Sequence, residues 1–180
     1  ALTQRPVRSM ICFGVALSFK LQTVFFLPAL LPLWLGKRIK LRHVLLIPAT
    51  YMAMMIPALW GGKSLHHVLT CYLQQAGHYN FITMNGPTLY QLLPAGLDSN
   101  MLYTMFSGMA LCLGLALLAG ACLLLCWRRE ALSTRSTMLF TLLVLSGVPY
   151  LLPKMHERYT FGADVFSLVV AVFEPKLAVL

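Results

Sequence analysis

The chain has 180 residues, of which 59% are hydrophobic and 11% are charged, and its formal net charge is +9. Soluble domains carry about 25% charged residues, so this composition excludes an ordinary water-soluble fold. The positive charge does not indicate nucleic-acid binding, because the basic residues stand in short clusters between long apolar stretches. We predict an all-α, polytopic transmembrane helix bundle of about five or six membrane helices, with residues 1–180 forming a single transmembrane domain.

The basic clusters predict how this bundle is oriented. In membrane proteins, short loops rich in Lys and Arg stay in the cytoplasm. Two such clusters separate apolar stretches of the chain; they are Lys37, Arg38, Lys40 and Arg42, and then Arg128, Arg129 and Arg135. We therefore expect a multi-pass membrane protein with these clusters in the cytoplasm and its other loops on the periplasmic or lumenal side.

The first apolar stretch covers residues 9–36 and is interrupted by Lys20 and Gln22. A single tilted helix of this length would place Lys20 near the centre of the bilayer, where a charge is costly. A hairpin of two short helices would instead place both polar residues at a turn near the outer face. We favour the hairpin, because it also leaves the basic residues on both flanks in the cytoplasm.

The next apolar stretch, residues 44–59, is expected to run outward as a helix and to end at a pair of glycines. Between residues 60 and 100 the only Lys or Arg is Lys63, while aromatic and amide side chains become frequent. This composition predicts a segment outside the membrane, with a short amphipathic helix at residues 65–75.

The remaining apolar stretches predict further membrane helices. Residues 101–127 contain no charged side chain and are long enough to return to the cytoplasm. Residues 137–152 are then expected to cross outward. Residues 165–173 are too short for a span, so we expect either that the helix begins at Phe161 and uses the tail to Leu180, or that the chain has been cut.

The cysteine and histidine pattern signals neither a disulfide framework nor a zinc site. The five cysteines include no CxxC pair. His66, His67, Cys71 and His78 lie near one another in the sequence, but their spacing matches no recognised zinc motif. We expect no metal and no cofactor, and no motif supports the alternative of a divalent cation.

Ionisable residues gather just after the expected helix at residues 137–152. The gathered residues with candidate roles are Lys154, His156, Glu157, Arg158, Tyr159 and Asp164. Arg158 and Lys154 are suited to hold a phosphate, because Arg donates paired hydrogen bonds and Lys adds a mobile charge. His156 or Glu157 could orient a sugar hydroxyl or the phosphate. The alternative is an interfacial cap whose charges snorkel to water and pair with one another.

Three stretches carry patterns that are known together from one family. The run from Met155 to Tyr159, with the later Asp164, matches a Met-His-Glu-Arg-Tyr signature. Residues 79–90 match a Tyr-x-x-Leu-Thr-x-Asn-Ala-Pro-x-x-Tyr loop, with Gly86 in place of alanine. Residues 19–22 match a Phe-Lys-Pro-Gln segment with leucine in place of proline. The chain thereby resembles bacterial polytopic glycosyltransferases of the GT-C superfamily, which are similar to the mannosyltransferases of GPI-anchor assembly.

The resemblance implies a multi-pass enzyme of the bacterial plasma membrane, with its functional loops on the periplasmic side. Such an enzyme transfers a hexose, such as mannose, from a polyprenyl-phosphate carrier to an acceptor at the outer face. Lys20 and Gln22 would join residues 154–164 in binding the lipid phosphate. The loop residues that would face the sugar or the acceptor are Tyr79, Asn80 and Asn85.

The family is thought to use an inverting displacement, assisted by a carboxylate in its first outer loop. No Asp or Glu precedes Lys20 in this chain, and Asp98 does not match the catalytic position. We therefore expect the chain to be the C-terminal part of such an enzyme, with its catalytic residue unassigned.

Two other classes of function stay open at this point. In a transporter or lipid flippase, Lys20, Glu157 and Asp164 would line a substrate path, although transporters usually place such groups at mid-membrane. In a small structural subunit, the chain would pack against other membrane proteins and perform no chemistry. All three hypotheses include membrane lipid as a partner, and none includes nucleic acid.

Overall fold

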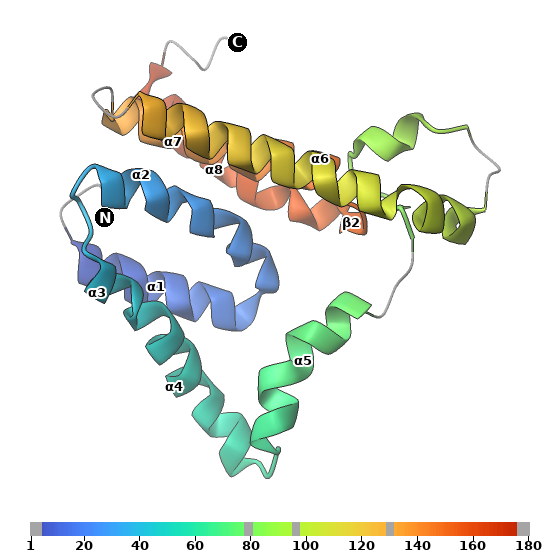
Figure 1. The fold of residues 1–180 in the computed structure, drawn as a ribbon. Helices are drawn as coiled ribbons and strands as arrows, with labels where there is room; N and C mark the ends of the chain where they lie inside the picture. Colours follow the sequence, from blue (N-terminus) through green and yellow to red (C-terminus); the bar gives the residue numbers. More distant parts are fainter. Residues whose placement is uncertain (1–4, 78–80, 95–97, 129–131, 176–180) are drawn as a thin grey trace. The chain divides into compact units, whose positions relative to one another are not determined.

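The computed structural model describes residues 5–77, 81–94, 98–128 and 132–175. Most of these residues are helical, so the predicted all-α class is confirmed at this level. The chain divides into two compact units, Ala1–Tyr79 and Asn80–Leu180, called the first and the second unit below and described separately (Figure 1). That residues 1–180 form one transmembrane domain stays a prediction.

The first unit is a helical hairpin followed by three further helices, the first of them only one turn long. Pro6 stands at the start of the first helix, where backbone N–H groups have no partner within the helix, so the absence of this group in proline costs no hydrogen bond. The elements are α1 (Pro6–Phe19), the 3-10 helix η1 (Leu21–Ala29), α2 (Leu30–Leu35), α3 (Leu41–Val44), α4 (Leu46–Trp60) and α5 (Leu65–Gly77).

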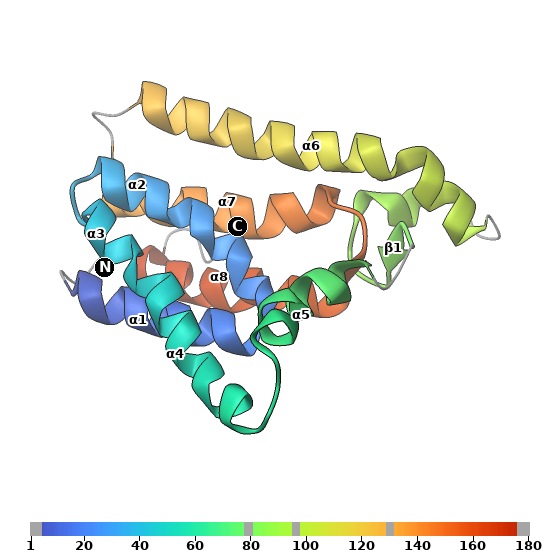
Figure 2. The ribbon, with the colours of Figure 1, turned by 60° about the horizontal axis from the view of Figure 1, so that its bottom comes forward.

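Lys20 separates the two arms of the hairpin. α1 ends at Phe19, and the backbone of Lys20 is extended, with φ −149° and ψ 129°. η1 and α2 then return along α1, so that Met10 and Leu33 lie in one buried cluster (Figure 2). The hairpin is therefore confirmed for the backbone, and the single tilted helix is wrong.

α1 and α4 approach each other closely at Gly14. A Cβ atom at this position would lie 2.7 Å from the Thr50 Cβ atom and 2.8 Å from the Ile47 carbonyl oxygen. The missing side chain lets the two backbones meet, as small residues do between membrane helices. Ile47 also belongs to the buried cluster of Met10 and Leu33.

α5 is anchored to the last turn of α1. The Tyr72 hydroxyl donates a hydrogen bond shared between the carbonyl oxygens of Leu17, at 3.0 Å, and Ser18, at 3.1 Å. Burial, and then the neighbouring Cys71 thiol, raise the pKa of Tyr72, so the hydroxyl keeps the proton that it donates. The predicted helix at residues 65–75 is confirmed and extends to Gly77.

The second unit contains one long helix, two further helices and a short pair of strands. The two longest helices both begin at a side-chain cap: Asp98 accepts a hydrogen bond from the backbone N–H of Asn100, and Ser133 from that of Ser136. The elements are β1 (Thr83–Met84), the 3-10 helix η2 (Leu89–Leu92), α6 (Ser99–Trp127), α7 (Thr134–Leu151), β2 (Met155–His156), the 3-10 helix η4 (Glu157–Tyr159) and α8 (Phe161–Phe173).

α6 and α7 run antiparallel, side by side, and α8 packs on α7 (Figures 1 and 2). Two glycines allow α6 and α7 to approach each other closely. A Cβ atom at Gly147 would lie 2.6 Å from Leu117 Cδ2, and one at Gly114 would lie 2.8 Å from Leu152 Cδ2. α8 begins at Phe161, as one alternative predicted, but it ends at Phe173 and does not run on through the tail.

Two stretches within the described ranges are long and apolar enough to cross a membrane, namely Leu41–Trp60 and Asn100–Trp127. The helices Pro6–Phe19 and Leu21–Leu35 are apolar but shorter. These stretches indicate association with a membrane. The five or six membrane helices expected from the sequence are more than these two stretches, and that number remains a prediction.

Candidate functional site

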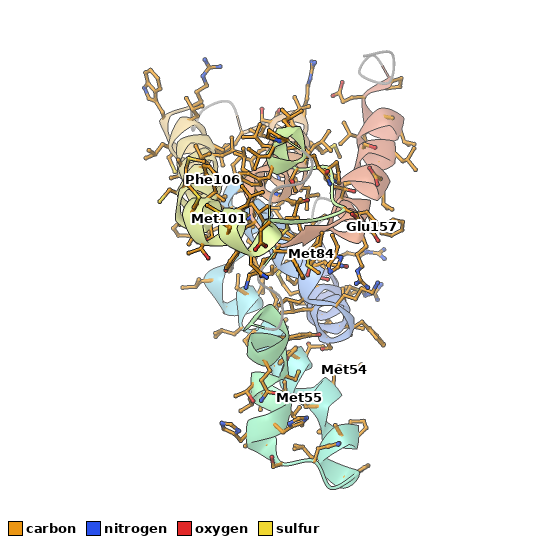
Figure 3. The ribbon with its side chains drawn as sticks, turned by 90° about the vertical axis from the view of Figure 1, so that its right-hand side faces the viewer. Met54, Met55, Met84, Met101, Phe106 and Glu157 are labelled. Carbon is orange, nitrogen blue, oxygen red and sulfur yellow. The ribbon has the colours of Figure 1, made fainter. Side chains whose placement is uncertain are left out.

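Two segments that the sequence singled out separately lie side by side in the second unit. β1 and β2 pair in parallel, with Thr83 opposite Met155 and Met84 opposite His156. Asn85 forms a further bridge to His156. The loop with the Asn-Gly-Pro sequence thus docks on the segment that carries the ionisable residues, as Figure 3 shows with Met84 and Glu157.

Gly86 makes this docking possible. A Cβ atom at this position would lie 2.5 Å from the Met155 carbonyl oxygen and 3.0 Å from the His156 carbonyl carbon. These neighbours are backbone atoms, which cannot turn away as a flexible side chain can. The alanine of the family motif therefore does not fit this backbone, which gives a physical reason for the glycine in this chain.

Tyr90 ties the same loop to the end of α7. Its side chain is only 5% exposed, and its hydroxyl donates a hydrogen bond of 2.7 Å to the Leu151 carbonyl oxygen. Burial raises the pKa of Tyr90, so the hydroxyl stays a donor. Thr88, also buried, donates to the Thr83 hydroxyl at 3.2 Å. These bonds fix the loop on both sides of its turn.

Two residues of the site have left-handed backbone conformations. Asn85 has φ 59° and Lys154 has φ 62°. Asparagine tolerates this region, whereas for lysine it costs about 1–2 kcal/mol, which the surrounding structure has to offset. The Lys154 backbone N–H donates to the Ile82 carbonyl oxygen at 3.1 Å, and Ile82 is buried. This bond holds the segment after α7 against the loop.

The Lys154 side chain lies against α6. Its Nζ atom is 4.8 Å from the centroid of the Tyr103 ring, a distance at which the face of the ring attracts a cation. Two residues further on, the rings of His156 and Tyr159 stack with centroids 6.1 Å apart and an angle of 15° between their planes. Cation and imidazole are thus both held by aromatic rings.

The remaining ionisable residues of the cluster face outward. Glu157 and Arg158 are exposed within η4, so both charged groups are open to a ligand. Asp164 is exposed in the first turn of α8, where its negative charge interacts favourably with the positive end of the helix dipole. The structure therefore brings Asn85, Lys154 and His156 together and places Glu157 and Arg158 directly after them.

The other predicted site residues lie elsewhere in the chain. Lys20, which is exposed, and Gln22, which is half-buried in η1, belong to the first unit. Their expected meeting with residues 154–164 stays a prediction. Tyr79 and Asn80 lie outside the described residues.

The described ranges contain no group of three or more His, Cys, Asp or Glu side chains that would hold a metal ion. His66 and His67 are exposed on α5, Cys71 is half-buried there, and His78 lies outside those ranges. Nothing in this part of the chain assigns a metal a role.

Sequence reasoning missed Tyr103 as a site residue and missed the anchoring role of Tyr90. Tyr103 stands in the apolar stretch that was interpreted only as a membrane helix. The one sequence signal for it is its place near the outer end of that stretch, where tyrosine is frequent.

Comparison of the chain with family models, with curated proteins and with solved structures found no match.

Proposed function

We propose that the chain is part of a polytopic membrane glycosyltransferase that transfers a hexose from a polyprenyl-phosphate carrier at the outer face of the membrane. The observation that carries this proposal is the pairing of β1 with β2. Two of the three motifs that resemble the GT-C family are far apart in the sequence, and they meet in one place. A shared site is a physical reason for both motifs to be present.

The positions of the tryptophans support a membrane-spanning arrangement. The chain has three, and each is exposed at a helix end: Trp34 in α2, Trp60 in α4 and Trp127 in α6, with exposed fractions of 51%, 87% and 83%. Tryptophan is enriched where membrane helices leave the hydrocarbon core. We propose that α1, η1 with α2, α7 and α8 also lie in the membrane, beside the two longer stretches.

The charges support the outer face for the site. Arg128 ends α6, and Arg135 lies in the first turn of α7, so both stand at the end of this helix pair that is far from Lys154. The positive-inside rule puts that basic end in the cytoplasm. Since α6 and α7 are antiparallel, the paired strands then lie at the opposite, periplasmic end. Lipid headgroups lie at this level.

The chemistry of the groups beside the paired strands fits an anionic lipid carrier. Arg158 offers a planar set of donors that matches two phosphate oxygens, and Lys154 adds a second positive charge. The Glu157 carboxylate can accept hydrogen bonds from sugar hydroxyls, and the His156 imidazole can accept or donate them. No residue of this sequence is assigned as the catalytic carboxylate, so the site proposed here binds and orients the donor.

The test is a transfer assay in proteoliposomes with the full-length protein and polyprenyl-phosphate mannose. We expect Glu157→Gln and Arg158→Ala each to lower transfer about tenfold or more, because each removes charge-assisted hydrogen bonds to the donor. The matched controls are Glu174→Gln, at the far end of α8, and Arg135→Ala, at the cytoplasmic end of α7.

Unchanged transfer in both site variants would overturn the assignment of the site. Movement of the lipid carrier across the bilayer without any sugar transfer would instead favour the transporter hypothesis. The controls should retain wild-type transfer, since they keep the charges next to the paired strands.

A further inference from the structure

We propose that Tyr103 is a positioning residue: its ring holds the Lys154 ammonium group in the place where that group binds the phosphate of the lipid carrier. This inference rests on the proposed function for the identity of the ligand. The observation behind it is the contact of 4.8 Å between Lys154 Nζ and the centroid of the Tyr103 ring.

Lys154 is constrained at both ends of its side chain. Its backbone is left-handed, with φ 62°, and its N–H group bonds the Ile82 carbonyl oxygen at 3.1 Å. The ammonium group at the other end lies on the Tyr103 ring. A lysine side chain gives up considerable rotamer freedom when it is fixed in this way. Such a cost is expected where the position of the charge matters.

Tyr103 is itself held in place. It packs, together with Phe106, against the buried cluster formed by Ile82, Tyr90 and Ala110. Tyr90 also connects the loop to the end of α7, and Ile82 connects it to Lys154 in the segment that follows. The ring is therefore part of the same rigid arrangement that sets the backbone of Lys154.

An aromatic ring suits this role better than a carboxylate. The face of the ring attracts a cation through its quadrupole and carries no net charge, so this contact does not neutralise the ammonium group. Lys has three donors, so the contact with the ring leaves the ammonium group able to bind a phosphate oxygen. Tyr103 lies in the second turn of α6, at the level proposed for lipid headgroups.

The experiment measures KM and kcat for polyprenyl-phosphate mannose, with the full-length protein in phosphatidylcholine vesicles. We expect Tyr103→Leu to raise KM about 3- to 20-fold with little change in kcat, because the cation–π contact positions a binding group. Tyr103→Phe and Tyr103→Trp should keep KM within about twofold, since both retain the ring. Tyr150→Leu removes a ring that is exposed in α7 and serves as the matched control.

A double-mutant cycle with Lys154→Met gives the decisive result. If Tyr103 acts through Lys154, Tyr103→Leu adds no further rise in KM once the ammonium is gone. An equal rise in both backgrounds would overturn the inference, and so would a Tyr103→Phe variant as impaired as Tyr103→Leu. If Tyr103→Leu does not yield folded protein, pentafluorophenylalanine at this position keeps the shape, reverses the charge distribution of the ring and should raise KM likewise.

Binding measurements separate this inference from the proposed function. Vesicles that contain polyprenyl phosphate, vesicles that contain phosphatidylglycerol, and inorganic phosphate in solution serve as three probes. Binding of polyprenyl phosphate without any sugar transfer would overturn the proposed function. In that case the double-mutant cycle of Tyr103→Leu and Lys154→Met, measured as binding affinity, still decides the role of Tyr103. Sugar transfer by the wild type with additive effects in the cycle would overturn only the role of Tyr103. Equal binding of phosphatidylglycerol would identify a general headgroup site and overturn the carrier as its ligand.

Discussion

The Tyr90 hydroxyl donates a hydrogen bond of 2.7 Å to the Leu151 carbonyl oxygen, across 61 positions of the sequence. The carbonyl belongs to the last turn of α7, whose carbonyl groups have no partner within the helix. The bond therefore satisfies the end of one helix and fixes the loop that precedes another. The pairing of β1 with β2 begins a few residues beyond this point.

Removal of the Tyr90 hydroxyl should loosen this connection. We expect Tyr90→Phe to lower the free energy of unfolding by about 1 kcal/mol, since it leaves the Leu151 carbonyl group without its donor. Thermal unfolding of the detergent-solubilised protein measures the effect. Tyr150→Phe, which changes an exposed tyrosine at the end of α7, should have little effect. Equal melting of both variants would show that the Leu151 carbonyl finds another donor.

The stability of the protein should fall in alkaline solution. Burial raises the pKa of Tyr72 and Tyr90 above the ordinary value of about 10. Between the ordinary and the raised pKa, the folded protein therefore binds more protons than the unfolded chain. The stabilisation is complete below about pH 10 and is lost as the pH rises through the folded-state pKa. We expect the melting temperature of the double variant Tyr72→Phe/Tyr90→Phe to fall less steeply above pH 10 than that of the wild type. Parallel curves would contradict this origin of the pH dependence.

Two glycines should respond to alanine in opposite directions. Gly86→Ala places a Cβ atom against the backbone of Met155, so we expect a loss of about 1–3 kcal/mol in the free energy of unfolding. Gly108→Ala, in the exposed middle of α6, meets nothing within 4 Å and should gain about 0.5–1 kcal/mol. Unfolding in detergent measures both. A neutral Gly86→Ala variant would mean that the loop can dock at a greater distance from β2.

The helices and the break at Lys20 were predictable from the sequence. Apolar stretches with almost no charge have few folded alternatives to membrane helices, because a lipid environment requires every backbone group to be satisfied within the segment. A single lysine in the middle of such a stretch then predicts the turn of the hairpin. The start of α8 stayed open, since its apolar run is shorter than a membrane span.

The construction of the site was less predictable. β1 and β2 have two residues each, too few for any alternation of polar and apolar side chains to appear. The family resemblance drew attention to both segments but gave no register between them. The contact of Tyr103 with Lys154 depends on how α6 packs beside the end of α7, and no local pattern encodes that distance.

The Tyr72 hydroxyl should control how firmly α5 is attached to α1. Tyr72→Phe removes the donor to the carbonyl oxygens of Leu17 and Ser18, the two residues that precede Phe19 at the end of α1. Both carbonyl groups are in the last turn of a helix, where intrahelical donors are missing, so the hydroxyl acts as a cap supplied by another helix. We expect faster hydrogen exchange of the backbone amides in α5, together with a loss of about 1 kcal/mol in the free energy of unfolding. Tyr51→Phe is the matched control, because Tyr51 touches the Tyr72 ring with a centroid distance of 6.2 Å and lies on α4. If exchange in α5 rises equally in both variants, the effect does not come from the hydrogen bond to Leu17 and Ser18. If it rises in Tyr72→Phe alone, the hydroxyl is the attachment, and α5 and the Lys20 turn depend on each other.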